Sequence, residues 1–243
     1  MTFADLLDPR RSQLATGAWV LRMTWHDLLF AHWPVAGESL QPLLPDGLKL
    51  ETYGGQAWLG VTPFWMSDVR PRLMPPVPTA GRFNEINVRT YVTDGRVPGI
   101  WFFSLDAHSQ LAVISARLGY ALNYYYADID RQCDGDWTIY RSRRAGGRAR
   151  FIGRYRAVGE LFRPAPDSLE HWLTERYHLY AGGLGQPLYR GQIEHEPWTL
   201  RGAEVEIETN TMTLPLGVDL PPTPPHTLFA ARKDVVAFWP RRI

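Results

Sequence analysis

Apolar residues recur mostly at every second position in this chain, and this period constrains the fold more than any other feature of the sequence. In FNEINVRTYV, residues 83–92, one set of alternate positions is mostly apolar and the other is mostly polar. Such alternation places successive side chains on opposite faces of a β-strand. With further strand-like stretches at 57–66, 99–107 and 227–239, the sequence predicts a β-rich α+β protein.

Four segments predict helices from their capping residues, their stop signals or a helical spacing of apolar residues. The predicted helices cover 24–33, 37–43, 109–120 and 166–182. In the first, Thr24 and Asp27 are three residues apart, as in a capping box, and a proline ends the helix. Ser109 is the expected N-cap of the third helix.

Aromatic and glycine residues complete the expected layout. The segment 122–127 is predicted as a strand because tyrosines suit a pleated surface. A hairpin is expected over 137–159, and 227–239 is expected to turn at 232–234. Pro63 predicts a bulge or an edge position in the strand that contains it.

Size and composition indicate one soluble domain. We expect residues 1–243 to form a single domain, with 1–22 as an N-terminal extension. No run of eighteen or more apolar residues is present, and charges interrupt the first twenty positions, so we expect a cytoplasmic protein without membrane contact. The lone Cys133 excludes an internal disulfide. A net charge of +1 gives no overall attraction for nucleic acid, which we do not expect as a partner.

The positive charge is almost entirely arginine. The only lysines are Lys49 and Lys233, and both are expected in turns, as solvated and fully charged ammonium groups. Arginines concentrate in the hairpin 141–156, where an anionic partner is one interpretation and a solvated strand face is the other.

Several blocks of the sequence together resemble a known family. These are HWPV with LLPDGLKL, then FNEINVRTYV, FFSLDA, ISARLGYALNYY, TERYHLY and HEPW. From about Trp25 to Trp239 the chain is similar to the YqjF-like family of uncharacterised bacterial proteins, which belongs more distantly with the acetoacetate decarboxylase-like proteins. The resemblance implies an acetoacetate decarboxylase-like β-barrel with a few peripheral helices and an enclosed small-molecule cavity.

The distant relationship also implies a missing nucleophile. Asn84 and Glu85 resemble the Asn-Glu pair of acetoacetate decarboxylases, and Arg117 resembles the arginine of their Gly-Arg-Glu helix end. Tyr124 and Tyr125 then fall where those enzymes carry two lysines. A phenol cannot form the iminium ion of Schiff-base decarboxylation, so that chemistry is not expected here.

Candidate site residues follow from the alternation and from the resemblance. Candidate catalytic residues are Glu85, Arg117 and Tyr124, and candidate ligand-binding residues are Asn87, Arg89, Asp106 and His108. The polar strand residues either line a cavity or form a solvated face held by salt bridges. If Glu85 is buried, we expect it to pair with Arg89 or Arg117, because an unpaired internal charge is costly.

The function expected from these residues is small-molecule binding without a cofactor. An enzyme acting on a small carboxylate or carbonyl compound by acid-base chemistry, a non-catalytic binder and an interaction module using the arginine-rich hairpin all remain open. No metal is expected, because His171, Glu175 and His178 do not follow the spacing of the known zinc signature. Exposed strand edges and ten tryptophans are compatible with a homo-oligomer.

Overall fold

The structure is a computed structural model that describes residues 17–76, 81–182, 185 and 187–243, and it describes only the backbone of residues 115–118 and 120. Its strands are β1 (Leu21–Val35), β2 (Lys49–Leu50), β3 (Ala57–Pro71), β4 (Phe83–Thr93), β5 (Pro98–Ala107), β6 (Tyr124–Asp134), β7 (Trp137–Arg144), β8 (Arg150–Phe162), β9 (His178–Gly182), β10 (Leu188–Glu194), β11 (Leu200–Asn210), β12 (His226–Ala237) and β13 (Arg241–Arg242). Its helices are α2 (Gly37–Leu40), α3 (Gln110–Tyr120) and α4 (Leu169–Thr174), with 3-10 turns η1 (Gln41–Leu43) and η2 (Leu214–Leu216). The β-rich α+β class predicted from the sequence is confirmed.

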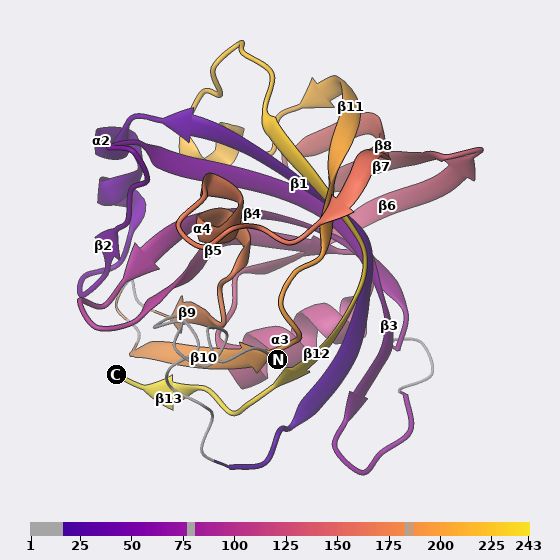
Figure 1. The fold of residues 1–243 in the computed structure, drawn as a ribbon. Coiled ribbons are helices and arrows are strands. Elements are labelled where there is room, and N and C mark those ends of the chain that lie inside the picture. Colours follow the sequence, from indigo (N-terminus) through magenta and orange to yellow (C-terminus); the bar gives the residue numbers. More distant parts are fainter. Residues whose placement is uncertain (1–16, 77–80, 183–184, 186) are drawn as a thin grey trace.

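The strands of the described residues form one sheet that closes on itself (Figure 1). Neighbouring strands run in the order β12-β1-β3-β4-β5, and β5 also pairs with β9, β9 with β10, and β10 with β12. We call this closed circuit the cavity ring. Strands β6, β7, β8 and β11 connect β5 to β12 by a second route, so the central strands are shared between two enclosed spaces.

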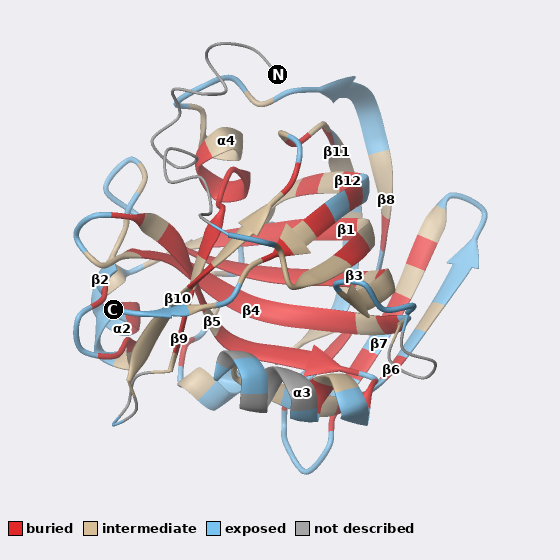
Figure 2. Cartoon of the chain, turned by 90° about the horizontal axis from the view of Figure 1, so that it is seen from below, coloured by how far each residue is buried: buried red, intermediate tan, exposed pale blue. Residues whose placement is uncertain are grey.

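Strand β4 is buried on both faces because it separates these two spaces (Figure 2). Ile86 and Val88 pack in an apolar cluster with Tyr140 of β7. The alternate residues Glu85 and Asn87 point the other way, into the cavity ring, and are 2% and 4% exposed. The alternation predicted over 83–92 is confirmed, and ring closure makes its polar face interior.

Residues 24–33 form part of the long strand β1, so the helix predicted there is wrong. Four consecutive residues, 28–31, are buried because both faces of β1 are covered, and a short apolar run of this kind does not distinguish strand from helix. Asp27 has a φ of 49° at an irregularity where the β1–β3 register shifts between His26 and Ala31. Pro63 lies opposite this gap, so its missing N–H costs no ladder bond and the bulge prediction is confirmed.

Two further boundaries differ from expectation. The helix predicted over 166–182 ends at Thr174, and the chain then forms β9, which pairs with β5 and β10. The expected turn at 232–234 does not exist, because β12 continues through these positions as a strand. It pairs with β1 on both sides of Asp27, with Leu28 opposite Ala230 and Trp25 opposite Lys233.

Lys233 is consequently buried at 8% exposure instead of solvated. Its Nζ donates to the carbonyl oxygens of Glu196 at 3.1 Å and Pro197 at 2.9 Å, and it lies over the Trp198 ring. Burial lowers the pKa of Lys233. The expectation of a turn lysine is therefore wrong.

Other predicted elements are confirmed. Residues 37–43 form α2 and η1, and 109–120 form α3, where the Ser109 side chain accepts a hydrogen bond from the N–H of Ala112. The hairpin about Gly146 and Gly147 joins β7 and β8. No helix among the described residues is long and apolar enough to cross a membrane.

A buried ion pair links the cavity ring to the second group of strands. Arg144 of β7 donates from Nε to Oδ2 of Asp106 at 2.8 Å and from Nη2 to Oδ1 at 2.6 Å. Asp106 on β5 is fully buried, and the guanidinium also covers the ring of Tyr125. This two-bond geometry fixes how β7 sits against β5.

We expect Asp106→Ala to lower the free energy of unfolding by about 3–5 kcal/mol, because it leaves a buried guanidinium without its carboxylate. Denaturant unfolding of the purified variant measures the change. The matched control is Glu206→Ala, which removes the exposed partner of Arg154 and should have little effect. Equal losses in the two variants would contradict a structural role for the buried pair.

Candidate functional site

The cavity ring encloses an elongated space of about 520 Å³. Side chains from β1, β3, β4, β5, β9, β10 and β12 line it, together with residues of α3, the first residue of β6 and the segment 195–198. Most of the lining is apolar, and a small group of polar side chains projects from β4 and its neighbours. A cavity of this size with few polar groups is typical of small-molecule sites.

Glu85 and Tyr124 form a buried pair in this cavity. The Tyr124 hydroxyl donates to Oε2 of Glu85 at 2.8 Å, and the Asn87 side chain is also hydrogen-bonded to the carboxyl group. Burial dominates over these hydrogen bonds and raises the pKa of Glu85 to about 8. Glu85 is therefore mostly a neutral carboxylic acid at pH 7.

Arg89 lies on the same face of β4, beyond Asn87, and is 7% exposed. Its guanidinium carbon is 5.1 Å from the centre of the Phe30 ring. Within the described residues, its Nε and Nη2 have no hydrogen-bond partner. The guanidinium is hydrogen-bonded to the side chain of Tyr91, and no described carboxylate pairs with it. The expected pairing of Glu85 with Arg89 is not found, and the Arg117 side chain lies outside the described residues.

Two more polar atoms near Arg89 also have no partner in the part of the chain that the structure describes. They are Oγ1 of Thr62 and Oδ1 of Asn87, on residues that face each other across β3 and β4. Buried polar groups are usually satisfied by protein or water, so atoms of this kind in one cavity are positions for ligand contacts.

The buried histidine near Arg89 adds no second positive charge. His32 is fully buried, and burial, together with Arg89, holds its pKa well below the usual value. Its Nε2 is hydrogen-bonded to the hydroxyl of Tyr91 at 2.7 Å, and this hydroxyl also donates to the carbonyl of Leu173. Gly60 is required here, because a Cβ at this position would lie 2.8 Å from Nε2 of His32.

A second group of polar residues lines the wall formed by β9 and its flanks. Arg176 pairs with Glu51 and lies over the Trp172 ring. Burial lowers the pKa of His178 to about 4, so its imidazole is neutral. Neither residue is a candidate from the sequence, because 166–182 is predicted there as one helix. In the structure β9 begins at His178, and its side chain lines the cavity.

The remaining predicted site residues lie elsewhere. Asp106 is held by Arg144, and neither is part of the cavity wall. His108 is exposed, and its Nδ1 contacts the backbone of Ala127 and Ile129. The structure therefore brings Glu85, Asn87, Arg89 and Tyr124 together but not Asp106 or His108.

The arginine-rich hairpin is largely neutralised by its own neighbours. Arg154 pairs with Glu206 at 2.8 Å and Arg156 with Glu204 at 2.6 Å, across β8 and β11. Both guanidinium groups also lie over the ring of Trp137. These contacts favour a solvated strand face at this hairpin.

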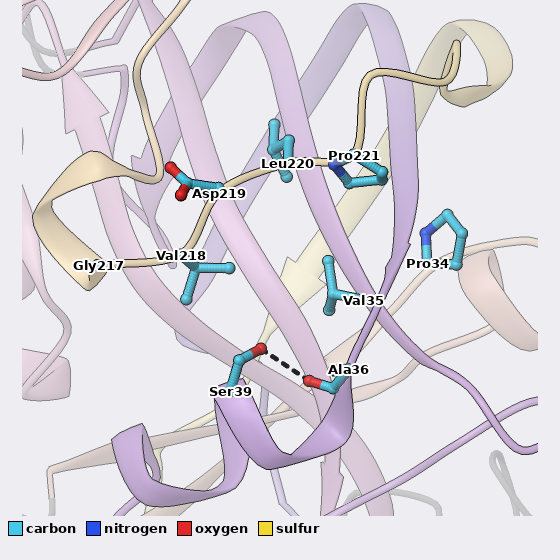
Figure 3. Close-up of a pocket in the computed structure, with 9 residues that line it drawn as sticks. All are labelled: Pro34, Val35, Ala36, Ser39, Gly217, Val218, Asp219, Leu220 and Pro221. Atoms are coloured by element: carbon cyan, nitrogen blue, oxygen red, sulfur yellow. Dashed lines mark hydrogen bonds between the residues drawn. The ribbon is translucent and has the colours of Figure 1, made fainter.

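A hollow of about 440 Å³ lies at the surface between α2 and the segment after η2 (Figure 3). Its lining includes Val35, Ser39 and Asp219, and the Ser39 hydroxyl donates to the carbonyl of Ala36 at 2.7 Å. Asp219 is the only ionisable residue of this lining and it is exposed. Four of the predicted site residues, Glu85, Asn87, Arg89 and Tyr124, line the interior cavity instead.

Solved structures with this arrangement are acetoacetate decarboxylase-like proteins. Acetoacetate decarboxylase from Legionella pneumophila superposes with a TM-score of 0.66 at 12% identity, over 98% of this chain and 95% of that one. An acetoacetate decarboxylase-like enzyme from Sphingomonas wittichii RW1 gives 0.62 at 14% identity, over 95% and 97%. The enduracididine biosynthesis enzyme MppR, complexed with pyruvate, gives 0.64 at 10% identity, over 95% and 93%. Identities this low show the fold alone, and that fold is acetoacetate decarboxylase-like, as the resemblance implied.

Sequence comparison defines the family more closely. Residues 22–234 match the family DUF2071, described as an uncharacterized conserved protein. The chain is 46% identical over 227 residues to the uncharacterized protein YqjF of Bacillus subtilis (strain 168), covering 93% of each chain. This chain belongs to the DUF2071 family of YqjF-like proteins, and that expectation is confirmed.

The buried acid makes stability depend on pH in a defined direction. Between pH 4.5 and about 8 the folded protein keeps a proton on Glu85 that the unfolded chain releases, so the free energy of unfolding falls as the pH rises through this window. Glu85→Gln should abolish this loss, which amounts to about 3–5 kcal/mol over the whole window. Denaturant unfolding of both proteins at several pH values measures it. Parallel stability curves for the two proteins would contradict a protonated Glu85.

Proposed function

We propose that this protein binds a small carboxylate in the interior cavity and acts on it by acid-base chemistry, with Arg89 holding the carboxylate and Glu85 exchanging the proton. Tyr124 orients the Glu85 carboxyl group, and Asn87 and Thr62 contact polar atoms of the ligand. No covalent intermediate and no cofactor take part. A small carbonyl acid is the substrate class that uses all of these groups.

The observation that carries the proposal is the buried guanidinium of Arg89. A charge in a water-poor interior is costly unless an opposite charge compensates it. Among the described residues no carboxylate pairs with Arg89, and the neighbouring Glu85 is held neutral by its own burial. A bound carboxylate would supply both the missing charge and acceptors for Nε and Nη2 in a two-bond geometry.

Glu85 has the properties that proton transfer requires. A group with a pKa near the working pH is populated in both its acid and base forms, which is the condition for general acid-base catalysis. As the acid, Glu85 can protonate a carbonyl oxygen or a carbanion. As the base, it can remove a proton from the carbon beside a carbonyl group. The same residue can serve both directions of an exchange.

The lysines do not offer an alternative mechanism. Lys49 is exposed, and the Nζ of Lys233 is held by two backbone carbonyl oxygens. Lys233 is also absent from the cavity wall. An imine would require this amine to leave both of its carbonyl partners and enter the cavity.

The names of the structural neighbours agree with this substrate class. One is an acetoacetate decarboxylase and another was solved with pyruvate, and both names refer to small carboxylates that carry a carbonyl group. At their low identity this is support from analogy of fold and not from shared residues.

We expect 2-oxobutanoate to bind and to exchange its C3 protons in D₂O in the presence of the protein, as followed by ¹H NMR. Arg89→Gln should weaken binding by about tenfold or more, and Glu85→Gln should slow the exchange by about 10²–10⁴-fold while the ligand still binds. The exposed Arg154→Gln is the matched control and should change neither quantity.

Two outcomes separate the alternatives. Binding that depends on Arg89 without any exchange would leave a non-catalytic binder and refute the acid-base role of Glu85. A reduced adduct on Lys233 after borohydride treatment, seen by mass spectrometry, would refute the lysine-free mechanism.

A further inference from the structure

The interior cavity is much longer than a small carbonyl acid needs. Arg89 lies six positions after Phe83 on β4, which corresponds to about 20 Å along the strand, and both residues line the cavity. A molecule such as pyruvate would occupy only the part between Arg89 and Glu85. The rest of the cavity needs a different explanation.

Strand registers show that the far part of the cavity is apolar. Phe83 is opposite Met66, one layer beyond the layer of Glu85 and Phe64. Further out, Leu21 is opposite both Pro71 and Ala237. All of these residues line the cavity.

Two neighbouring elements extend this apolar layer. Ile193 of β10 is opposite Ala237, and Leu111 and Ala112 of α3 also contribute to the wall. Leu111 is 46% exposed, so the apolar part of the cavity extends to the surface of the molecule. We call the end formed by Leu21, Val69, Pro71, Phe83, Leu111 and Ala237 the apolar end.

Most polar groups of the wall lie away from this end, and the exception is His195, whose ring lies beside Trp25. Glu85, Asn87 and Arg89 follow one another inward along β4, and Thr62 is paired with Asn87. Arg176 and His178 approach from β9 and its flank, with Arg176 paired to Glu51 and His178 kept neutral by burial. The cavity therefore has a polar end around Arg89 and a mainly apolar end that meets the surface.

We propose that the ligand is an amphiphilic monocarboxylate, with its carboxylate at Arg89 and an extended apolar body that runs past Glu85 to the apolar end. This inference rests on the proposed function, since it takes the carboxylate at Arg89 as given. An alkyl or arylalkyl chain fits this arrangement because it gains free energy from apolar walls along its whole length. Water is a poor occupant of the apolar end, which offers it few hydrogen-bond partners.

The test is a chain-length series of straight-chain acids, measured by isothermal titration calorimetry with the full chain. We expect the affinity to rise by up to about fourfold for each methylene from butanoate through octanoate to hexadecanoate, which is the gain from burying one methylene. A more negative heat capacity of binding for the longer acids should accompany this rise.

A variant at the apolar end localises the chain. Val69→Asn should weaken hexadecanoate binding by about tenfold and leave butanoate binding within about twofold, because only the longest chain, about 20 Å when extended, spans the cavity from Arg89 to this end. Leu161→Asn is the matched control: Leu161 is 62% exposed on β8, is not in the cavity wall, and should change neither affinity.

The outcomes distinguish the two proposals. A flat series, with butanoate and hexadecanoate bound equally and both weakened by Arg89→Gln, would overturn the amphiphilic ligand and leave the carboxylate site intact. Failure of every acid to bind, or binding indifferent to Arg89→Gln, would overturn the carboxylate site itself. A series that rises with length but is insensitive to Val69→Asn would overturn the placement of the chain.

Discussion

Burial of the polar face of β4 is the constraint on which the site depends. Closure of the cavity ring turns Glu85, Asn87 and Arg89 away from water, and the second group of strands covers the opposite face of the same strand. Polar groups in such a place must be neutralised, hydrogen-bonded or reserved for a ligand. Each of the three residues represents a different one of these solutions, and this division gives the cavity its chemical character.

Glu85 and Arg89 respond to the same burial in opposite ways because their chemistry differs. A carboxylate can take up a proton, and burial raises the pKa of Glu85 to about 8. A guanidinium keeps its charge in proteins, so Arg89 cannot escape the cost in this way. It is stabilised in part by the Phe30 ring, and the uncharged His32 beside it adds no second cation. An acid of adjustable protonation and a fixed cation on the same face of one strand form a suitable arrangement for proton transfer on an anionic ligand that lies between them.

The sequence predicted the local part of this arrangement and not the long-range part. Alternation over 83–92 identified the strand and its polar face, but alternation is equally compatible with a solvated face. Pairing of β10 with β12, which closes the ring, joins residues distant in sequence and leaves no local signal. The consecutive apolar residues around Leu29 were compatible with a helix. In a strand that is covered on both faces, apolar residues no longer alternate with polar ones, so the strand pattern is absent.

Lys233 illustrates the same limit and bears on the mechanism. The charged residues on either side of it, Arg232 and Asp234, indicated a turn. In the structure all three residues belong to the continuous strand β12, where Arg232 and Asp234 face the solvent and Lys233 faces inward. The only buried lysine of the described chain therefore lies on β12, whereas the resemblance to decarboxylases concerns β6, where Tyr124 now contacts Glu85. Two backbone carbonyls hold the Lys233 amine in the wall that carries Trp198. These two hydrogen bonds tie the segment 195–198 to β12, and in the proposed mechanism the proton is exchanged by the carboxyl group on β4.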